Sequence, residues 1–269
     1  MTESQVNIKR IKIYLSDPQV LFREGIHFIL SGEEDLEVIG EATNNEDAYK
    51  QIEANPPNIA ILNIQDKKVS GPEITRLIKR KFPSTAVILT IEKKEPEELL
   101  EIMKSGASAC LLKDIDPENL LEIIRVVAQG SLPVMEELLT PELAQKVLAE
   151  FKDIENISEQ MENLMAGLTE RESQVLSSIA AGSSLEEAAT KAGIDEDVAW
   201  YNLRLALNKL VANDHIQAIV ETVQQGIPSI LETTSRTKKL SKEYLTREEF
   251  NKFKESLVKR LQNIASEAV

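Results

Sequence analysis

Short runs of aliphatic and β-branched residues alternate with amphipathic stretches over residues 1–130. Between the runs, apolar residues recur every three or four positions, which is typical of a helix with one buried face. The runs predict buried strands at residues 11–15, 36–42, 58–62, 85–91 and 109–112. Strands that alternate with helices favour a parallel sheet with helices on both faces, so we expect an α/β domain here.

Polar residues follow the predicted strands at one edge of this sheet. Ser16 and Asp17 follow the first strand, Asn63 follows the third, Thr90 lies at the end of the fourth and Lys113 follows the fifth. Ligands of open parallel sheets bind at the carboxyl ends of the strands. The sequence therefore predicts a site at this edge.

The domain resembles the receiver domain of bacterial response regulators. Four segments carry the resemblance in order, namely SDPQVLFREGI (16–26), PNIAILNIQDKKVSG (57–71), VILT (87–90) and SACLLKD (108–114). The resemblance implies a flavodoxin-like fold with a five-stranded parallel sheet. It also implies two acids that hold Mg²⁺, an aspartate that accepts phosphate, a Ser or Thr, and a Lys.

The chain departs from that pattern at the positions that bind Mg²⁺ and accept phosphate. Thr90 and Lys113 match, and Asp17 matches the first acid, but Pro18 stands at the second acid and Asn63 at the phosphoacceptor. An amide nitrogen is delocalised and is not a nucleophile. Mg²⁺ prefers carboxylate oxygens. We therefore expect a pseudo-receiver without catalytic residues, metal or cofactor.

Other residues of the predicted site leave alternatives open. Asp66 could swing in as a further carboxylate. Lys113 is expected to pair with Asp17, and this pair is expected to hold one fixed conformation. Thr90 either keeps its place in the family's site or is simply a residue that strand ends tolerate. Cys110 stands where the family usually has a switching aromatic, and its apolar neighbours favour a core position over a redox sensor.

Residues 131–167 predict a helical linker. TPELAQKVLAEF (140–151) resembles the linker of LuxR/NarL-type regulators, with Thr140 as helix cap before Pro141. Farther on, apolar residues repeat at steps of three and four positions, namely Ile154, Ile157, Met161 and Leu164. This stripe fits a helix packed on its own domain or a short seam of a homodimer.

Residues 168–228 resemble the LuxR-type helix-turn-helix domain, most clearly over residues 168–210. Thr169 and Glu172 form a capping box, Ser183 or Ser184 caps the second helix, and Gly193 marks the turn before the third. Apolar residues at helical spacing predict the core, namely Leu185, Ala188, Ala189, Ile194, Val198, Leu203, Leu207 and Leu210.

The third helix is the recognition helix of that family, where lysines meet DNA. Here Asp197 and Trp200 stand at the lysine positions, and residues 168–228 carry 4 basic and 9 acidic side chains. DNA affinity depends on Lys and Arg contacts with phosphates, so we expect weak DNA binding. The candidate contacts, with DNA or protein, are Asp197, Val198, Trp200, Tyr201, Asn202, Arg204 and Lys209.

The aromatic pair in this helix has three interpretations. Exposed Trp200 and Tyr201 suit a protein interface, where these residue types concentrate binding energy. Trp200 could instead fold into the core. Intercalation into DNA is the third interpretation.

Residues 229–269 form a basic extension with 9 basic and 6 acidic side chains. A capping box at Thr246 and Glu249 predicts one helix. Its apolar face is Phe250, Phe253, Leu257, Leu261 and Ile264, and its basic residues are Lys252, Lys254, Lys259 and Arg260. Such a helix packs on its own chain or a dimer mate, or binds a membrane or DNA.

Composition narrows the class of protein. The chain has 269 residues, a net charge of −14, one cysteine and two histidines, which disfavours a disulfide, a zinc site or a nucleophilic triad. It has no apolar run of bilayer length and no signal-like start, so we expect a cytoplasmic protein. The expected function is atypical, phosphorylation-independent transcription control by binding, with a partner protein, small ligand or dimerisation as input. An adaptor that never touches DNA is the alternative, and an enzyme is a distant third.

Overall fold

The fold is taken from a computed structural model, which describes residues 10–66, 68–155 and 165–236. The chain divides into two compact units. Of the described residues, 10–66, 68–150 and 168–211 belong to the first unit, and 151–155, 165–167 and 212–236 belong to the second. The predicted basic helix of the C-terminal extension, and the stripe residues Ile157, Met161 and Leu164, lie outside the described residues.

Five parallel strands form one sheet in the order β2-β1-β3-β4-β5. The strands are β1 (Ile11–Ser16), β2 (Leu36–Ala42), β3 (Ile59–Asn63), β4 (Ala86–Ile91) and β5 (Ala109–Leu112). The predicted flavodoxin-like sheet is confirmed, with every strand end within one residue of its predicted place. Asn63 and Thr90 are paired in register, so the ends of β3 and β4 lie side by side.

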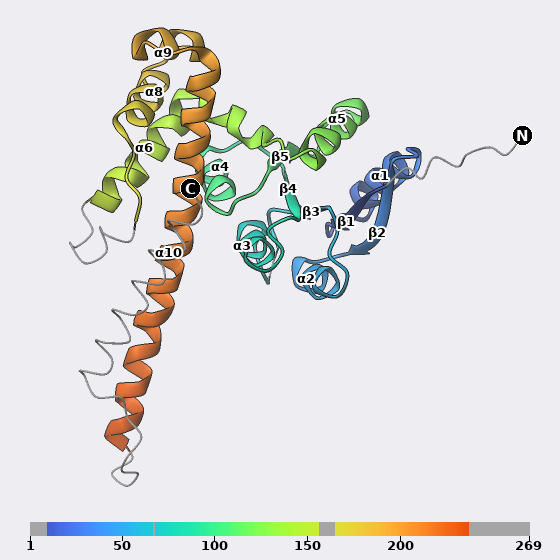
Figure 1. The fold of residues 1–269 in the computed structure, drawn as a ribbon. Coiled ribbons are helices and arrows are strands. Elements are labelled where there is room, and N and C mark those ends of the chain that lie inside the picture. Colours follow the sequence, from blue (N-terminus) through green and yellow to red (C-terminus); the bar gives the residue numbers. More distant parts are fainter. Residues whose placement is uncertain (1–9, 67, 156–164, 237–269) are drawn as a thin grey trace, which may run out of the picture. The chain divides into compact units, whose positions relative to one another are not determined.

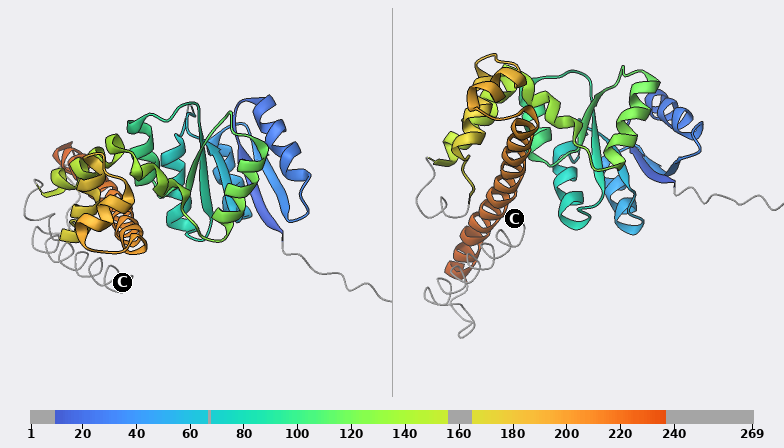
Figure 2. Two further views of the ribbon diagram at one scale, coloured as in Figure 1. Left: turned by 90° about the horizontal axis from the view of Figure 1, so that it is seen from above. Right: turned by 45° about the horizontal axis from the view of Figure 1, so that its top comes forward.

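Five helices cover both faces of this sheet (Figures 1 and 2). They are α1 (Val20–Ser31), α2 (Asn45–Ala54), α3 (Gly71–Lys81), α4 (Pro96–Lys104) and α5 (Pro117–Ala128). The helices α1 and α5 close a core against one face, built from Ile13, Leu15, Ile26, Leu30, Ile59, Ile61, Ile88, Leu120 and Ile124. The helices α2, α3 and α4 cover the other face (Figure 2).

Local sequence signals explain where these helices begin. The side chains of Asn44, Ser70 and Asp116 accept hydrogen bonds from backbone N–H groups of the first helical turn. Gly71 is needed for a different reason, because a Cβ there would lie 2.7 Å from the Cα of Ile64. The chain can therefore turn from β3 into α3 only with a glycine at this position.

The linker begins with a 3₁₀ helix, η1 (Pro133–Leu139), and continues as α6 (Pro141–Glu155). Val134, Met135 and Leu138 of η1 are buried. Two ion pairs join α4 to α6, from Glu97 to Lys146 at 2.6 Å and from Lys104 to Glu150 at 3.0 Å. The first part of the linker therefore packs on the α/β domain.

The helix-turn-helix consists of α8 (Glu170–Ala180), α9 (Leu185–Ala192) and the start of α10 (Glu196–Arg236). The predicted capping box of Thr169 and Glu172 is present, and Ser184 rather than Ser183 caps α9. Gly193 ends α9 in the left-handed conformation, at φ 64°. The predicted scaffold is thus confirmed.

One predicted core residue of this domain is wrong. Val198 is 38% exposed, and the neighbouring Ala199 is fully buried in its place. Successive residues of a helix differ by about 100° in direction, so an error of one position turns a side chain from core to solvent. Ile194 is half-buried, whereas the other predicted core residues are buried.

The second unit is described only in part. In it, α10 continues past Gly226 and Pro228 to Arg236. The buried side chain of Asn213 donates to Ala166 O at 3.0 Å and accepts from Ala166 N at 2.9 Å. Across the described residues, no helix has the length and apolar character of a membrane span.

Candidate functional site

The carboxyl edge of the sheet holds a buried ion pair. Lys113 Nζ lies 2.9 Å from Asp17 Oδ2, and the two side chains are only 9% and 5% exposed. Lys113 also lies 3.3 Å from Glu92 Oε1, and its ammonium group is 5.2 Å from the centre of the Phe22 ring. The contact predicted from the sequence is present, and two carboxylates rather than one balance the lysine charge.

Asn63 ends β3 beside this pair, and its side-chain amide forms a hydrogen bond with the loop that follows. Asn63 Nδ2 donates to Gln65 O at 2.5 Å, and the residue is buried. A delocalised amide in this position offers no nucleophile for a phosphoryl group. The side chain stabilises the β3–α3 loop instead.

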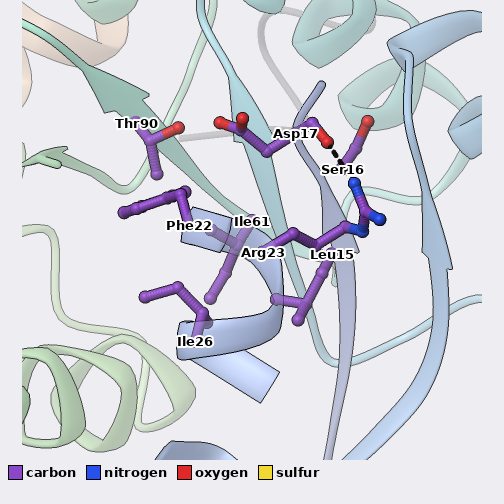
Figure 3. Close-up of a pocket in the computed structure, with 8 residues that line it drawn as sticks. All are labelled: Leu15, Ser16, Asp17, Phe22, Arg23, Ile26, Ile61 and Thr90. Carbon is purple, nitrogen blue, oxygen red and sulfur yellow. Dashed lines mark hydrogen bonds between the residues drawn. The ribbon is translucent and has the colours of Figure 1, made fainter. Parts of the chain in front are cut away.

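Thr90 and Asp17 face each other across a small cavity (Figure 3). The Thr90 hydroxyl donates weakly to Leu62 O at 3.4 Å. The cavity has a volume of about 10 Å³, which is roughly the space of one water molecule. Arg23 closes it from α1 by donating to Asp17 O at 2.7 Å, shown dashed in Figure 3. The edge is therefore filled by the protein's own side chains.

The carboxylate of Asp66 is bound by backbone N–H groups. It accepts from the backbone N–H of Asn45 at 2.9 Å and of Lys68 at 2.9 Å. Both bonds tie it to the start of α2 and to its own loop. The alternative in which Asp66 supplies a second carboxylate to the site is not supported by this arrangement.

Sequence reasoning missed the residue that joins these loops. Asn45 is fully buried at the start of α2. It accepts from the Ser16 hydroxyl at 3.2 Å and donates to Asn63 O at 3.0 Å and Val69 O at 3.1 Å. No local signal marks it, because the adjacent Asn44 already caps the helix. Its partners come from β1, β3 and the β3–α3 loop.

Mg²⁺ does not fit this donor set. A receiver-type metal site needs several carboxylate oxygens, whereas Asp17 is the one carboxylate among the described residues that line this cavity, and it is paired with Lys113. Asp66 is bound elsewhere. Among the described residues there is also no group of three His, Cys, Asp or Glu side chains that could hold a metal ion.

Cys110 lies in β5, partly buried, beside the linker. Its sulfur is 3.8 Å from Glu137 Oε1, and the same oxygen lies 2.5 Å from Lys94 Nζ. Burial, and then the charge of Glu137, raise the pKa of the thiol to about 12. A thiol of that pKa stays protonated at neutral pH and is a poor nucleophile. The geometry fits the predicted packing role.

The recognition helix presents acids and one exposed aromatic ring. Asp197, Tyr201 and Arg204 are exposed, and Tyr201 is 60% exposed. Trp200 is half-buried, so its side chain is neither fully exposed nor folded into the core. Acids in the first turn also stabilise the helix N-terminus through its dipole, so Glu196 and Asp197 have a structural role as well.

Two of the predicted contact residues on this helix face inward. Asn202 is buried and donates to Val198 O at 2.7 Å. Lys209 lies 2.7 Å from Glu172, whose side chain is 1% exposed. Arg204 is then the one basic candidate of this helix that is exposed, among the residues named from the sequence. The predicted basic contacts Lys252, Lys254, Lys259 and Arg260 lie outside the described residues.

Several known proteins are similar to this chain. The response regulator receiver domain matches residues 13–125. Transcriptional regulatory protein LnrK of Bacillus subtilis (strain 168) is 31% identical over 221 residues, 81% of this chain and 98% of that protein. Transcriptional regulatory protein DegU of Brevibacillus brevis is 29% identical over 82% of this chain and 97% of its own length. The solved receiver domain of the putative response regulator NarL from Mycobacterium tuberculosis is 26% identical, with 45% of this chain and 98% of that chain covered and a TM-score of 0.44.

Proposed function

The chain belongs to the LuxR/NarL-type response regulators, and we propose that it controls transcription by binding, without phosphorylation of its receiver domain. The observation that carries the proposal is Asn63 at the end of β3, where the amide bonds to Gln65 O. Acyl-phosphate formation requires a carboxylate at that position.

The partners of Lys113 support the same proposal. In this chain Asp17 and Glu92 already neutralise the lysine, and Phe22 packs over it. An incoming phosphoryl group would have to compete with these carboxylates for the ammonium group. The receiver edge then acts as a fixed structural junction, and the signal enters through a partner protein, a small ligand or dimerisation.

Beryllofluoride tests this proposal because it mimics a phosphoryl group coordinated to a carboxylate. We expect no change in the amide NMR signals of Asn63, Thr90 and Lys113 when beryllofluoride and Mg²⁺ are added to the full chain. Asn63→Asp is the matched variant, since it restores the carboxylate at the same place. Saturable shifts of these signals in the unaltered chain would contradict the proposal.

DNA binding by the helix-turn-helix is proposed to be weak. Its recognition helix begins with Glu196 and Asp197, and Lys209 is paired with Glu172. Each lost phosphate contact removes its share of counterion release, so binding at low salt weakens and the slope of log affinity against log salt falls by about one. Negative charge at the start of the helix adds repulsion from the phosphates.

A protein-docking adaptor is the second candidate, favoured by the exposure of Tyr201. An exposed tyrosine beside Val198 and acidic residues suits a partner with a basic and apolar surface. A gel-shift titration at low salt separates the candidates, with the chain intact and with residues 229–269 removed. No shift at micromolar protein supports the adaptor. A shift that vanishes without residues 229–269 places the DNA contact in the extension.

A further inference from the structure

A second cavity lies at the opposite edge of the receiver sheet, where the strands begin. Its volume is about 230 Å³, and its polar lining comprises Asn58, Lys79, Ser84, Ser108 and Ser131, with Gly130 at the rim. Asn58 precedes β3 and Ser108 precedes β5, whereas the Asp17–Lys113 pair lies at the strands' carboxyl ends. This cavity is therefore separate from the site described above.

Lys79 gives the cavity a positive charge that no acid balances. Its ammonium group donates to Thr85 O at 3.0 Å and to Pro83 O at 3.4 Å. Within the described part of the chain it forms no ion pair, and no Asp or Glu lines the cavity. Lysine has three N–H donors, so two carbonyl contacts leave one for a further acceptor.

The pKa of Lys79 agrees with this geometry. Burial lowers it from the ordinary value for lysine, and no neighbouring charge acts in either direction. Burial in a polar site without a counter-charge disfavours the ammonium form. An anion in the cavity would restore the charge balance and raise the pKa again.

Ser108 places a second hydrogen-bond donor at this cavity. The residue is 3% exposed and lines the cavity. Its backbone N–H donates to Val87 O and its carbonyl accepts from Val134 N, while its hydroxyl forms no hydrogen bond with any residue that the structure describes. The hydroxyl is therefore open to the cavity rather than buried without a partner, and it can donate to an oxygen of a bound anion.

We propose that this cavity binds a small oxyanion, a molecule with a carboxylate or phosphate group of which inorganic phosphate and acetate are the simplest examples. Lys79 balances the charge, and Ser108 donates to an oxygen at the floor. Ser131 and Leu132 lead directly into η1, so the bound anion stabilises the start of the linker. The inference does not depend on the state of Asn63 or on DNA binding.

NMR titration of the full chain tests the proposal, with sodium phosphate and sodium acetate in separate series at constant ionic strength. We expect saturable shifts of the Ser84, Ser108 and Ser131 amide signals in at least one series. If the shifts saturate with phosphate alone, the natural ligand of the cavity carries a phosphate group. If they saturate with acetate alone, it carries a carboxylate. Shifts that stay linear in both series would overturn the proposal.

Three variants locate the binding. Lys79→Gln is expected to weaken it about tenfold, since it removes the charged hydrogen bond. Ser108→Ala is expected to weaken binding about fivefold. If Lys79→Gln fails to fold, the Ser108→Ala variant tests whether the anion binds in this cavity. Arg80→Gln changes an exposed cation on the same helix and should leave binding unchanged. Equal binding by Ser108→Ala and the unaltered chain would contradict the assignment.

Discussion

The receiver edge and the recognition helix both depart from their family's chemistry, but they do so differently. At the receiver edge the polar groups find partners inside the domain, so Lys113, Asn63 and Asp66 are each bound by neighbouring residues. On the recognition helix the acids and Tyr201 stay exposed. The polar groups of the first region are therefore bound within the protein, whereas the side chains of the second region remain available to a partner.

This difference is what we expect if the first region has lost its phosphorylation chemistry and the second has changed its partner, as proposed above. A buried polar group without a partner is costly, so a receiver that loses its acceptor must satisfy the remaining groups internally. An exposed helix has no such constraint, since water satisfies its side chains. Its new surface can therefore serve a different partner while the scaffold of α8, α9 and α10 stays intact.

The largest expected effect follows from breaking the closed region. Lys113→Ala leaves Asp17 buried without its cation, and removal of one member of a buried pair costs about 3 kcal/mol. We expect the free energy of unfolding of the receiver domain to fall by that amount in urea denaturation followed by NMR or circular dichroism. Lys93→Ala is the control, because Lys93 is exposed on the neighbouring loop. An unchanged midpoint for Lys113→Ala would remove the structural role of the pair.

Asn45→Ala should have the next largest effect. It removes a buried amide that joins Ser16, Asn63 and Val69, and leaves their polar groups without partners. We expect a loss of about 2 kcal/mol in unfolding free energy. Faster hydrogen exchange should follow at the start of α2 and in the β3–α3 loop. Asn55→Ala, at the exposed end of α2, should show neither change.

A smaller effect is expected from the open surface. Asp197→Lys replaces an exposed acid in the first turn of α10 by a cation. One added phosphate contact, with one repulsion removed, should tighten non-specific DNA binding roughly tenfold at low salt. Fluorescence anisotropy at several salt concentrations measures this, with Asp214→Lys, farther along α10, as the control. Equal affinities for the two variants would mean that the start of α10 does not face DNA.

The last prediction concerns the reactivity of the Cys110 thiol, which should be very low in the folded chain. Because its pKa is raised to about 12 by burial and by Glu137, almost no thiolate is present at pH 8. We expect alkylation by iodoacetamide to be far slower in the folded chain than in urea, and to remain slow until the pH approaches the raised pKa. Rapid labelling of the folded chain at pH 8 would point to a redox role.

Local patterns predicted most of the fold and little of the hydrogen bonding in the site. Strands, caps and the turn at Gly193 follow from short-range periodicity and from capping residues, so the sequence located them. The Asp17–Lys113 pair was also predictable, because parallel strands bring their carboxyl ends together.

The contacts that were missed are long-range or depend on helix rotation. Asn45 was missed because its partners come from three separate segments. Glu92 was missed because it lies in a loop whose path no periodic pattern defines. Val198 and Ala199 were exchanged because apolar spacing does not fix a helix rotation to one residue.

Intact-mass spectrometry after incubation with acetyl phosphate and Mg²⁺ tests the central claim, which is that the receiver edge cannot form an acyl phosphate. The unaltered chain should keep its mass at every time point, with a receiver that has an intact phosphoacceptor treated in parallel as the positive control. A stable gain of one phosphoryl group that maps to Asp17 or Asp66 would contradict it.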